Sequence, residues 1–112
     1  MSAHYLKKND AGQVLDLQLM EATGYPRVIT GGVTLHIKLA SGTVLSRNMT
    51  VVEAAKGRVQ YAWQVGDWGG GTPLVIGTHQ MEYEELPAGG GRLTFPNNAN
   101  DSLVITDHIA DA

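Results

Sequence analysis

The sequence contains no cysteine, and only one of its 112 residues is phenylalanine. The lack of cysteine excludes disulfide bonds, thiolate nucleophiles and cysteine-based zinc sites. No apolar run approaches the roughly 20 residues of a membrane-spanning helix, and residues 1–10 lack the apolar stretch of a secretory signal. We therefore expect a protein that is made in the cytoplasm and has no membrane partner.

Basic residues are also scarce. Eight Lys and Arg stand against eleven Asp and Glu, and the net charge of -3 argues against nucleic acid as the partner. Residues 1–60 hold seven basic and four acidic residues, whereas residues 61–112 hold one and seven. This asymmetry has two interpretations: solvated surfaces, or a polar molecule whose ends attract one another in a head-to-tail assembly.

The dominant hydrophobic period is two, which is typical of half-buried strands. It is clearest in residues 13–21, 32–40, 58–65 and 77–85. Fourteen glycines supply turns between these segments, and the length suits one domain. We predict an all-β, two-sheet antiparallel sandwich of seven to eight short strands over residues 1–112, with flexible ends at about 1–5 and 107–112.

The side chains that alternate to one face of these strands define the expected core. Residues 51–56 are the only helix-leaning piece, and Gly57 is expected to end that turn. The predicted core consists of Leu17, Leu35, Ile37, Val59, Tyr61, Trp63, Tyr83 and Phe95.

The glycine run at residues 66–73, GDWGGGTP, is interpreted as a turn rather than a phosphate-binding loop, because no helix and no lysine follow it. Asp67 is expected to bond local backbone, as aspartate does in turns. A large aromatic on a glycine loop favours a contact site. The predicted contact residues are Trp68, Gly69, Gly70 and Gly71, together with Tyr5, Lys7 and Lys8 near the N-terminus.

No motif predicts catalysis or a cofactor. Histidines 4, 36, 79 and 108 are dispersed and form no metal-ligand pair, and no serine lies in G-x-S-x-G. The Asn-rich residues 97–102 lack the order of a calcium loop. We expect a protein without catalytic residues, metal or cofactor, with His36 on the surface and His79 as a satisfied core-edge side chain.

Four segments in order resemble the N-terminal domain of phage baseplate upper proteins. They are residues 16–45, residues 51–67 with their A-A-x-G-x-V-x-Y-x-W pattern, residues 77–85, and residues 90–105 with T-F-P. The resemblance implies an immunoglobulin-like sandwich and a non-enzymatic structural role in a tailed-phage virion, in the tail, baseplate, neck or capsid surface. It also implies other virion proteins, and copies of the chain related by symmetry, as partners.

An alternative from another class is a carbohydrate- or ligand-binding sandwich, with Trp68, Tyr25 or Tyr83 as stacking platforms. A small hydrolase or metal enzyme is the third hypothesis.

Overall fold

The computed structural model describes residues 3–95 and 101–107, which form nine strands and two short 3₁₀ helices. The elements are β1 (Ala3–Lys7), β2 (Val14–Gln18), β3 (Gly32–Lys38), β4 (Val44–Asn48), β5 (Thr50–Glu53), η1 (Ala54–Lys56), β6 (Arg58–Ala62), η2 (Val65–Trp68), β7 (Gly77–Leu86), β8 (Leu93–Phe95) and β9 (Asp101–Thr106).

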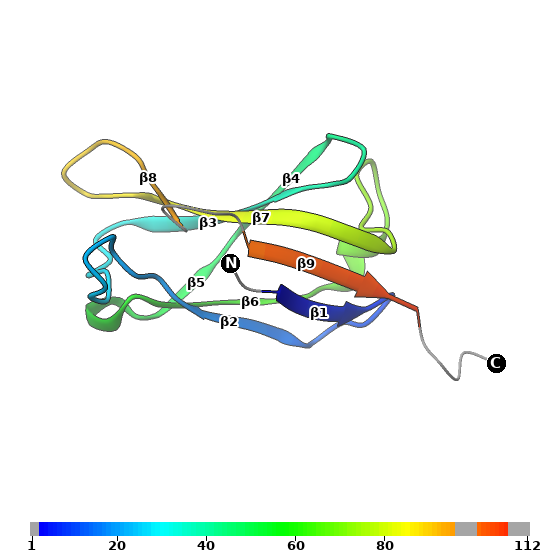
Figure 1. The fold of residues 1–112 in the computed structure, drawn as a ribbon, viewed down its shortest axis with the longest axis horizontal. Helices are drawn as coiled ribbons and strands as arrows, with labels where there is room; N and C mark the ends of the chain where they lie inside the picture. The colour runs from blue at the N-terminus through cyan, green and yellow to red at the C-terminus, as the bar shows by residue number, and fades with distance from the viewer. Residues whose placement is uncertain (1–2, 96–100, 108–112) are drawn as a thin grey trace.

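The strands form two sheets that pack face to face (Figure 1). The larger sheet has the order β1-β9-β7-β3-β4, and β8 pairs with β7 beyond the end of β9. The smaller sheet has the order β2-β6-β5. Strands pair antiparallel except β1 and β9, which are parallel. This architecture confirms the predicted immunoglobulin-like β-sandwich, with nine strands instead of seven to eight.

The core lies between the sheets, where the period-two pattern placed it. Leu35, Ile37 and Val59 are fully buried, whereas Leu17 is half-buried and packs against the core from its side. The other predicted core residues are buried as well. On β6, the rings of Tyr61 and Trp63 meet edge to face, with centroids 5.1 Å apart, a geometry that adds to the area they bury.

The N-terminal segment differs from the expectation. Residues 3–5 lie within the stretch predicted to be a flexible end, yet they belong to β1, which pairs with β9 from Ala3 to Lys7. Only Leu6 of this strand is a buried apolar residue, so its sequence carries little period-two signal. Of the flexible end predicted at 107–112, residues 108–112 lie outside the described residues.

The helical turn predicted at residues 51–56 is confirmed only in its second half. Residues 51–53 extend β5, and η1 spans the remaining three residues. Gly57 ends this turn in the left-handed conformation, with φ at 70°. An added Cβ there would lie 2.6 Å from the Leu19 carbonyl oxygen, so both space and backbone require glycine.

One extended segment joins the two sheets. β4 is an edge strand of the larger sheet and β5 is an edge strand of the smaller sheet, and only Met49 separates them. Met49 is buried, and its N–H donates to the carbonyl of Val33 at 2.9 Å. The chain therefore crosses from sheet to sheet without leaving the core.

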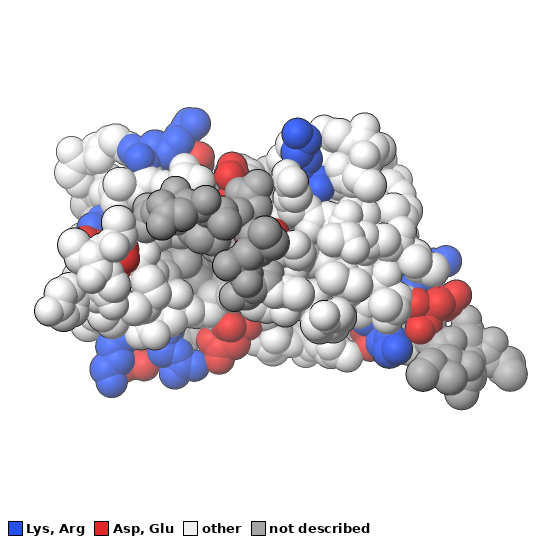
Figure 2. Space-filling model, in the orientation of Figure 1, with Lys and Arg blue, Asp and Glu red and all other residues white. Residues whose placement is uncertain are grey.

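Charges of both signs are interspersed over the face shown in Figure 2. Arg58 illustrates the pairing: it lies 2.8 Å from Asp16 and 3.7 Å from Glu53. The basic and acidic parts of the sequence therefore do not form opposite charged ends on this face.

Candidate functional site

Three carboxylates are buried in the described part of the chain, and their partners decide what each one does. They are Glu85 on β7, Asp67 on η2 and Asp101 on β9. A buried carboxylate costs stability unless charged or hydrogen-bonding groups compensate it.

Glu85 is completely buried and fastens the loop between β2 and β3. Arg27 donates from Nε to Oε1 at 2.8 Å and from Nη2 to Oε2 at 3.2 Å, and the Thr30 N–H donates at 2.9 Å. Burial acts to raise the pKa of Glu85, but the hydrogen bonds from Arg27 and Thr30 outweigh it and lower that pKa. This carboxylate therefore has a structural role.

Asp67 organises the loop that contains the glycine run. Tyr61 donates its hydroxyl to Oδ2 at 2.8 Å, Arg47 donates Nε to Oδ1 at 2.8 Å, and the Gln64 N–H donates at 2.9 Å. Burial, followed by the bond to Asp67, raises the pKa of Tyr61 to about 12. The prediction that Asp67 bonds local backbone is confirmed. The glycine run is a loop that the buried Asp67 carboxylate fixes through its hydrogen bonds.

Two histidines occupy the expected places. His79 is buried; its Nδ1 accepts the Ala40 N–H at 3.2 Å, and its Nε2 lies 2.8 Å from the Val75 carbonyl oxygen. His36 is on the outer face of β3, with Nδ1 2.8 Å from the Ser46 hydroxyl. Both imidazole rings therefore have hydrogen-bond partners within the fold.

Asp101 differs from the other two carboxylates because it faces an unsatisfied group. Tyr83 donates its hydroxyl to Oδ2 of Asp101 at 2.8 Å, and burial, followed by this bond, raises the pKa of Tyr83. Nε2 of His4 lies 3.5 Å from the same Oδ2, is buried, and has no hydrogen-bond partner. Among the described residues, His4 has the only buried side-chain nitrogen or oxygen in this state.

His4 also lines a hollow of about 350 Å³ at one side of the sandwich. The hollow lies where β1 of the larger sheet faces β2 of the smaller sheet, and Asp16, Trp63 and Leu103 contribute to its walls. The His4 side chain is 25% exposed and that of Asp101 is 12% exposed. The pair is therefore close to solvent but largely enclosed.

The predicted contact residues differ in how far they are exposed. Trp68 is half-buried against the core, and its indole N–H donates to the Asp10 carbonyl at 2.8 Å. The glycines beside it, residues 69–71, are exposed, as is Tyr5 at 73%, whereas Lys7 and Lys8 are half-buried. A contact role for these residues stays a prediction.

The stacking platforms of the alternative hypothesis also separate. Tyr25 is 74% exposed, but Tyr83 is buried, and its hydroxyl bonds Asp101. Tyr83 therefore cannot present its ring to a sugar, and that part of the alternative is wrong.

Sequence reasoning missed the two features that matter most here. It placed His4 in a loose end, and it assigned no role to Asp101 in a loop-to-strand junction. A histidine at an inward position of an edge strand was the only available signal, because the two residues are brought together by the pairing of the first and last described strands.

No protein-family model and no curated protein matches the sequence. The structure is similar to the crystal structure of CopC from Methylosinus trichosporium OB3b, with a TM-score of 0.51 and 8% sequence identity over 96% of this chain and 87% of that chain. At this identity the similarity concerns the fold, and it supports the assignment of a β-sandwich.

The expected role as a structural protein of a phage virion is wrong. The structural similarity is to CopC and points away from a virion component. The residues that carried the resemblance serve the fold itself: Gly57 ends a helical turn, Trp63 fills the core and Asp67 holds a loop. They are therefore required by the architecture and say little about function.

No helix among the described residues has the length and apolar character needed to span a membrane.

Proposed function

We propose that the chain is a non-catalytic metal-handling domain that binds a transition-metal cation between His4 and Asp101. The observation that carries the proposal is the buried Nε2 of His4, which faces a carboxylate oxygen at 3.5 Å and has no hydrogen-bond partner.

The spacing of the two atoms suits shared coordination. Metal–nitrogen and metal–oxygen bonds of about 2.1 Å at a tetrahedral angle place two ligand atoms about 3.4 Å apart. The pair of His4 and Asp101 has nearly this separation, whereas a direct hydrogen bond is shorter. A cation between them would satisfy the orphan nitrogen and compensate the buried carboxylate.

Tyr83 supports the carboxylate as a neighbour of a metal ligand does. Its hydroxyl bonds Oδ2 of Asp101 and fixes the orientation of that group. The described residues contain no group of three His, Asp or Glu side chains arranged for one metal ion. The protein therefore supplies two ligands, and water reaching the site through the adjacent hollow supplies the others.

The ligand set predicts the order of affinity. Imidazole and carboxylate ligands bind first-row divalent ions with Cu²⁺ strongest. We expect Cu²⁺ to bind more tightly than Zn²⁺ or Ni²⁺, and Mg²⁺ not to compete.

The other buried acids support a binding rather than a catalytic role. Glu85 and Asp67 are each engaged by an arginine and by a backbone N–H, so neither is poised to transfer a proton. The pair of His4 and Asp101 is therefore the arrangement that can bind a ligand, because Nε2 of His4 has no hydrogen-bond partner.

Calorimetric titration of the chain with Cu²⁺ tests the proposal. We expect one site per chain, at least tenfold weaker binding in His4→Gln and in Asp101→Asn, and unchanged binding in the control His36→Gln, whose ring lies on the outer face. Circular dichroism melting of each variant shows whether it folds. Folded His4→Gln and Asp101→Asn variants that bind Cu²⁺ as the wild type does would refute the site.

A further inference from the structure

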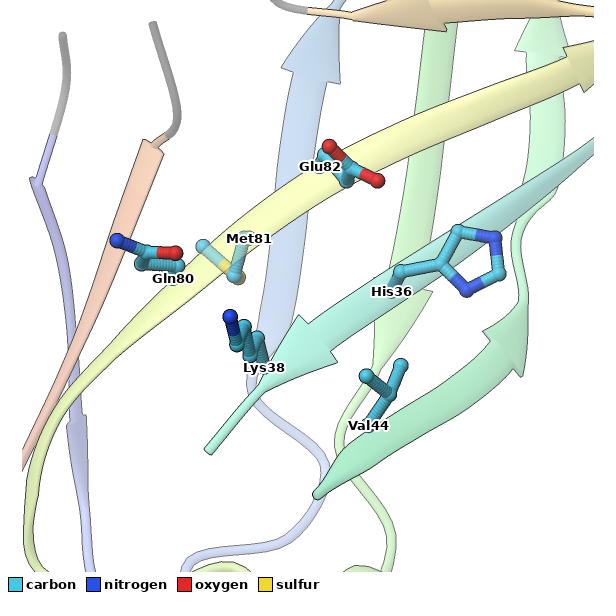
Figure 3. Close-up of a pocket in the computed structure, with 6 residues that line it drawn as sticks. All are labelled: His36, Lys38, Val44, Gln80, Met81 and Glu82. Carbon is cyan, nitrogen blue, oxygen red and sulfur yellow. The ribbon is translucent and has the colours of Figure 1, made fainter. Parts of the chain in front are cut away.

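A second hollow, of about 260 Å³, lies on the outer face of the larger sheet, and neither His4 nor Asp101 lines it. It spans β4, β3 and β7, and Figure 3 shows the side chains around it. The lining residues are His36, Lys38, Val44, Gln80, Met81 and Glu82.

Two opposite charges in this hollow lack the partners that other charges have. Across residues 3–95 and 101–107, Lys38 and Glu82 are the only Lys, Arg, Asp or Glu side chains without a hydrogen bond, ion pair or other electrostatic contact. Every other such charge in this part of the chain is engaged, even on the exposed surface. That both exceptions line the same hollow is the observation that carries this inference.

The sheet register explains why Lys38 and Glu82 do not neutralise one another. Lys38 lies opposite Gln80, and Glu82 lies opposite His36, so the two charges are diagonal neighbours on β3 and β7. Diagonal neighbours across an antiparallel pair are about 7–8 Å apart. This offset leaves room for a small molecule to contact both charges.

The remaining walls are polar on one side and apolar on another. His36 is held by the Ser46 hydroxyl and lies 3.7 Å from Glu84, which fixes it as a wall. Val44 on the edge strand β4 is 54% exposed and offers an apolar surface beside the charges (Figure 3). The volume lies below the roughly 300–1,000 Å³ of sites for drug-sized ligands.

We propose that this hollow binds a small zwitterion of the α-amino acid class. The ligand carboxylate contacts the Lys38 ammonium, the ligand ammonium contacts the Glu82 carboxylate, and an aliphatic side chain packs on Val44. A ligand with a single charge satisfies only one of the two protein charges. Because the hollow is open to water, which weakens ion pairs, we expect a dissociation constant on the order of millimolar.

Chemical-shift titration of the ¹⁵N-labelled chain with L-valine tests the proposal. We expect saturable shifts confined to amides of β3, β4 and β7 around the hollow, and at least tenfold weaker binding of acetate and of methylammonium at equal ionic strength. Lys38→Gln and Glu82→Gln should each weaken L-valine binding at least tenfold. The matched controls are Lys56→Gln and Glu53→Gln, which remove a surface lysine and a surface glutamate from the other side of the molecule.

Equal binding of acetate, methylammonium and L-valine would overturn the proposal, because it would show separate single-charge contacts. Unchanged L-valine binding in Lys38→Gln and Glu82→Gln, or shifts located elsewhere, would overturn it as well. Both variants alter exposed side chains, so their spectra should retain the wild-type dispersion.

Discussion

The guanidinium of Arg27 donates to both carboxylate oxygens of Glu85, although the two residues are 58 positions apart in the sequence. The contact joins the long loop after β2 to β7, a central strand of the larger sheet, at the end where β7 lies between β3 and β8. It fixes a segment without strand structure of its own onto the sandwich.

This pair predicts a specific loss of stability in acid. The folded-state pKa of Glu85 lies below its ordinary value of 4.5. Its contribution is therefore complete above that value and is lost as the pH falls through the lowered pKa of the folded state. Glu85→Gln should lower the free energy of unfolding by about 3 kcal/mol at pH 7 and should make it depend less on pH below 4.5.

Urea unfolding from pH 7 to pH 3 measures both effects. The control is Glu53→Gln, which removes an exposed carboxylate and should change the stability by less than about 1 kcal/mol. An identical slope against pH in wild type and Glu85→Gln would show that Glu85 is not held by Arg27.

Tyr61 predicts the opposite dependence in alkali. Because the pKa of Tyr61 is raised from 10 to about 12 in the folded chain, its contribution is complete below pH 10 and is lost as the pH rises toward 12. Tyr61→Phe also removes a hydrogen bond to Asp67, at a cost of about 1 kcal/mol at pH 7. The stability difference between wild type and variant should therefore shrink between pH 10 and pH 12.

Urea unfolding at pH 8, 10 and 11.5 tests this expectation. Tyr25→Phe changes an exposed ring and should follow the wild type throughout. A difference that stays constant over this range would mean that Tyr61 ionises alike in the folded and unfolded chain.

A substitution at Gly57 should destabilise the fold more than the same substitution at Gly42, a second glycine with positive φ. Alanine at this position adopts a left-handed conformation and meets the carbonyl oxygens of Leu19 and Arg27, so Gly57→Ala should cost about 2 kcal/mol or more. Gly42 also has positive φ, at 96°, but a Cβ there meets nothing within 4 Å. Gly42→Ala should therefore cost less, and thermal unfolding of the two variants should rank them in that order; the reverse order would contradict this account.

The period-two pattern was enough to predict the sandwich and its core, because each of those strands places several apolar side chains inward. β1 escaped prediction because its stability comes from pairing with β9 and from Leu6 alone. The burial of Glu85 was not predicted either. A glutamate at this inward position of β7 is stable only because a distant arginine compensates its charge. Local pattern cannot reveal such a partner.

The same reason limited the prediction of the candidate metal site. His4 and Asp101 come from opposite ends of the described chain, and neither has a neighbour in sequence that suggests a ligand set. The hollow at Lys38 and Glu82 could be found only once the strand register was known. The register places these two opposite charges on the same face of the sheet as diagonal neighbours.

The passage of β4 into β5 has a consequence for how the molecule comes apart. The continuous segment β4–Met49–β5 forms an edge strand in each sheet and is anchored between them at Met49. Separating the two sheets would therefore strain the backbone at Met49. We expect the two sheets to unfold together. Thermal or denaturant unfolding should therefore show a single cooperative transition without a populated, partly unfolded intermediate.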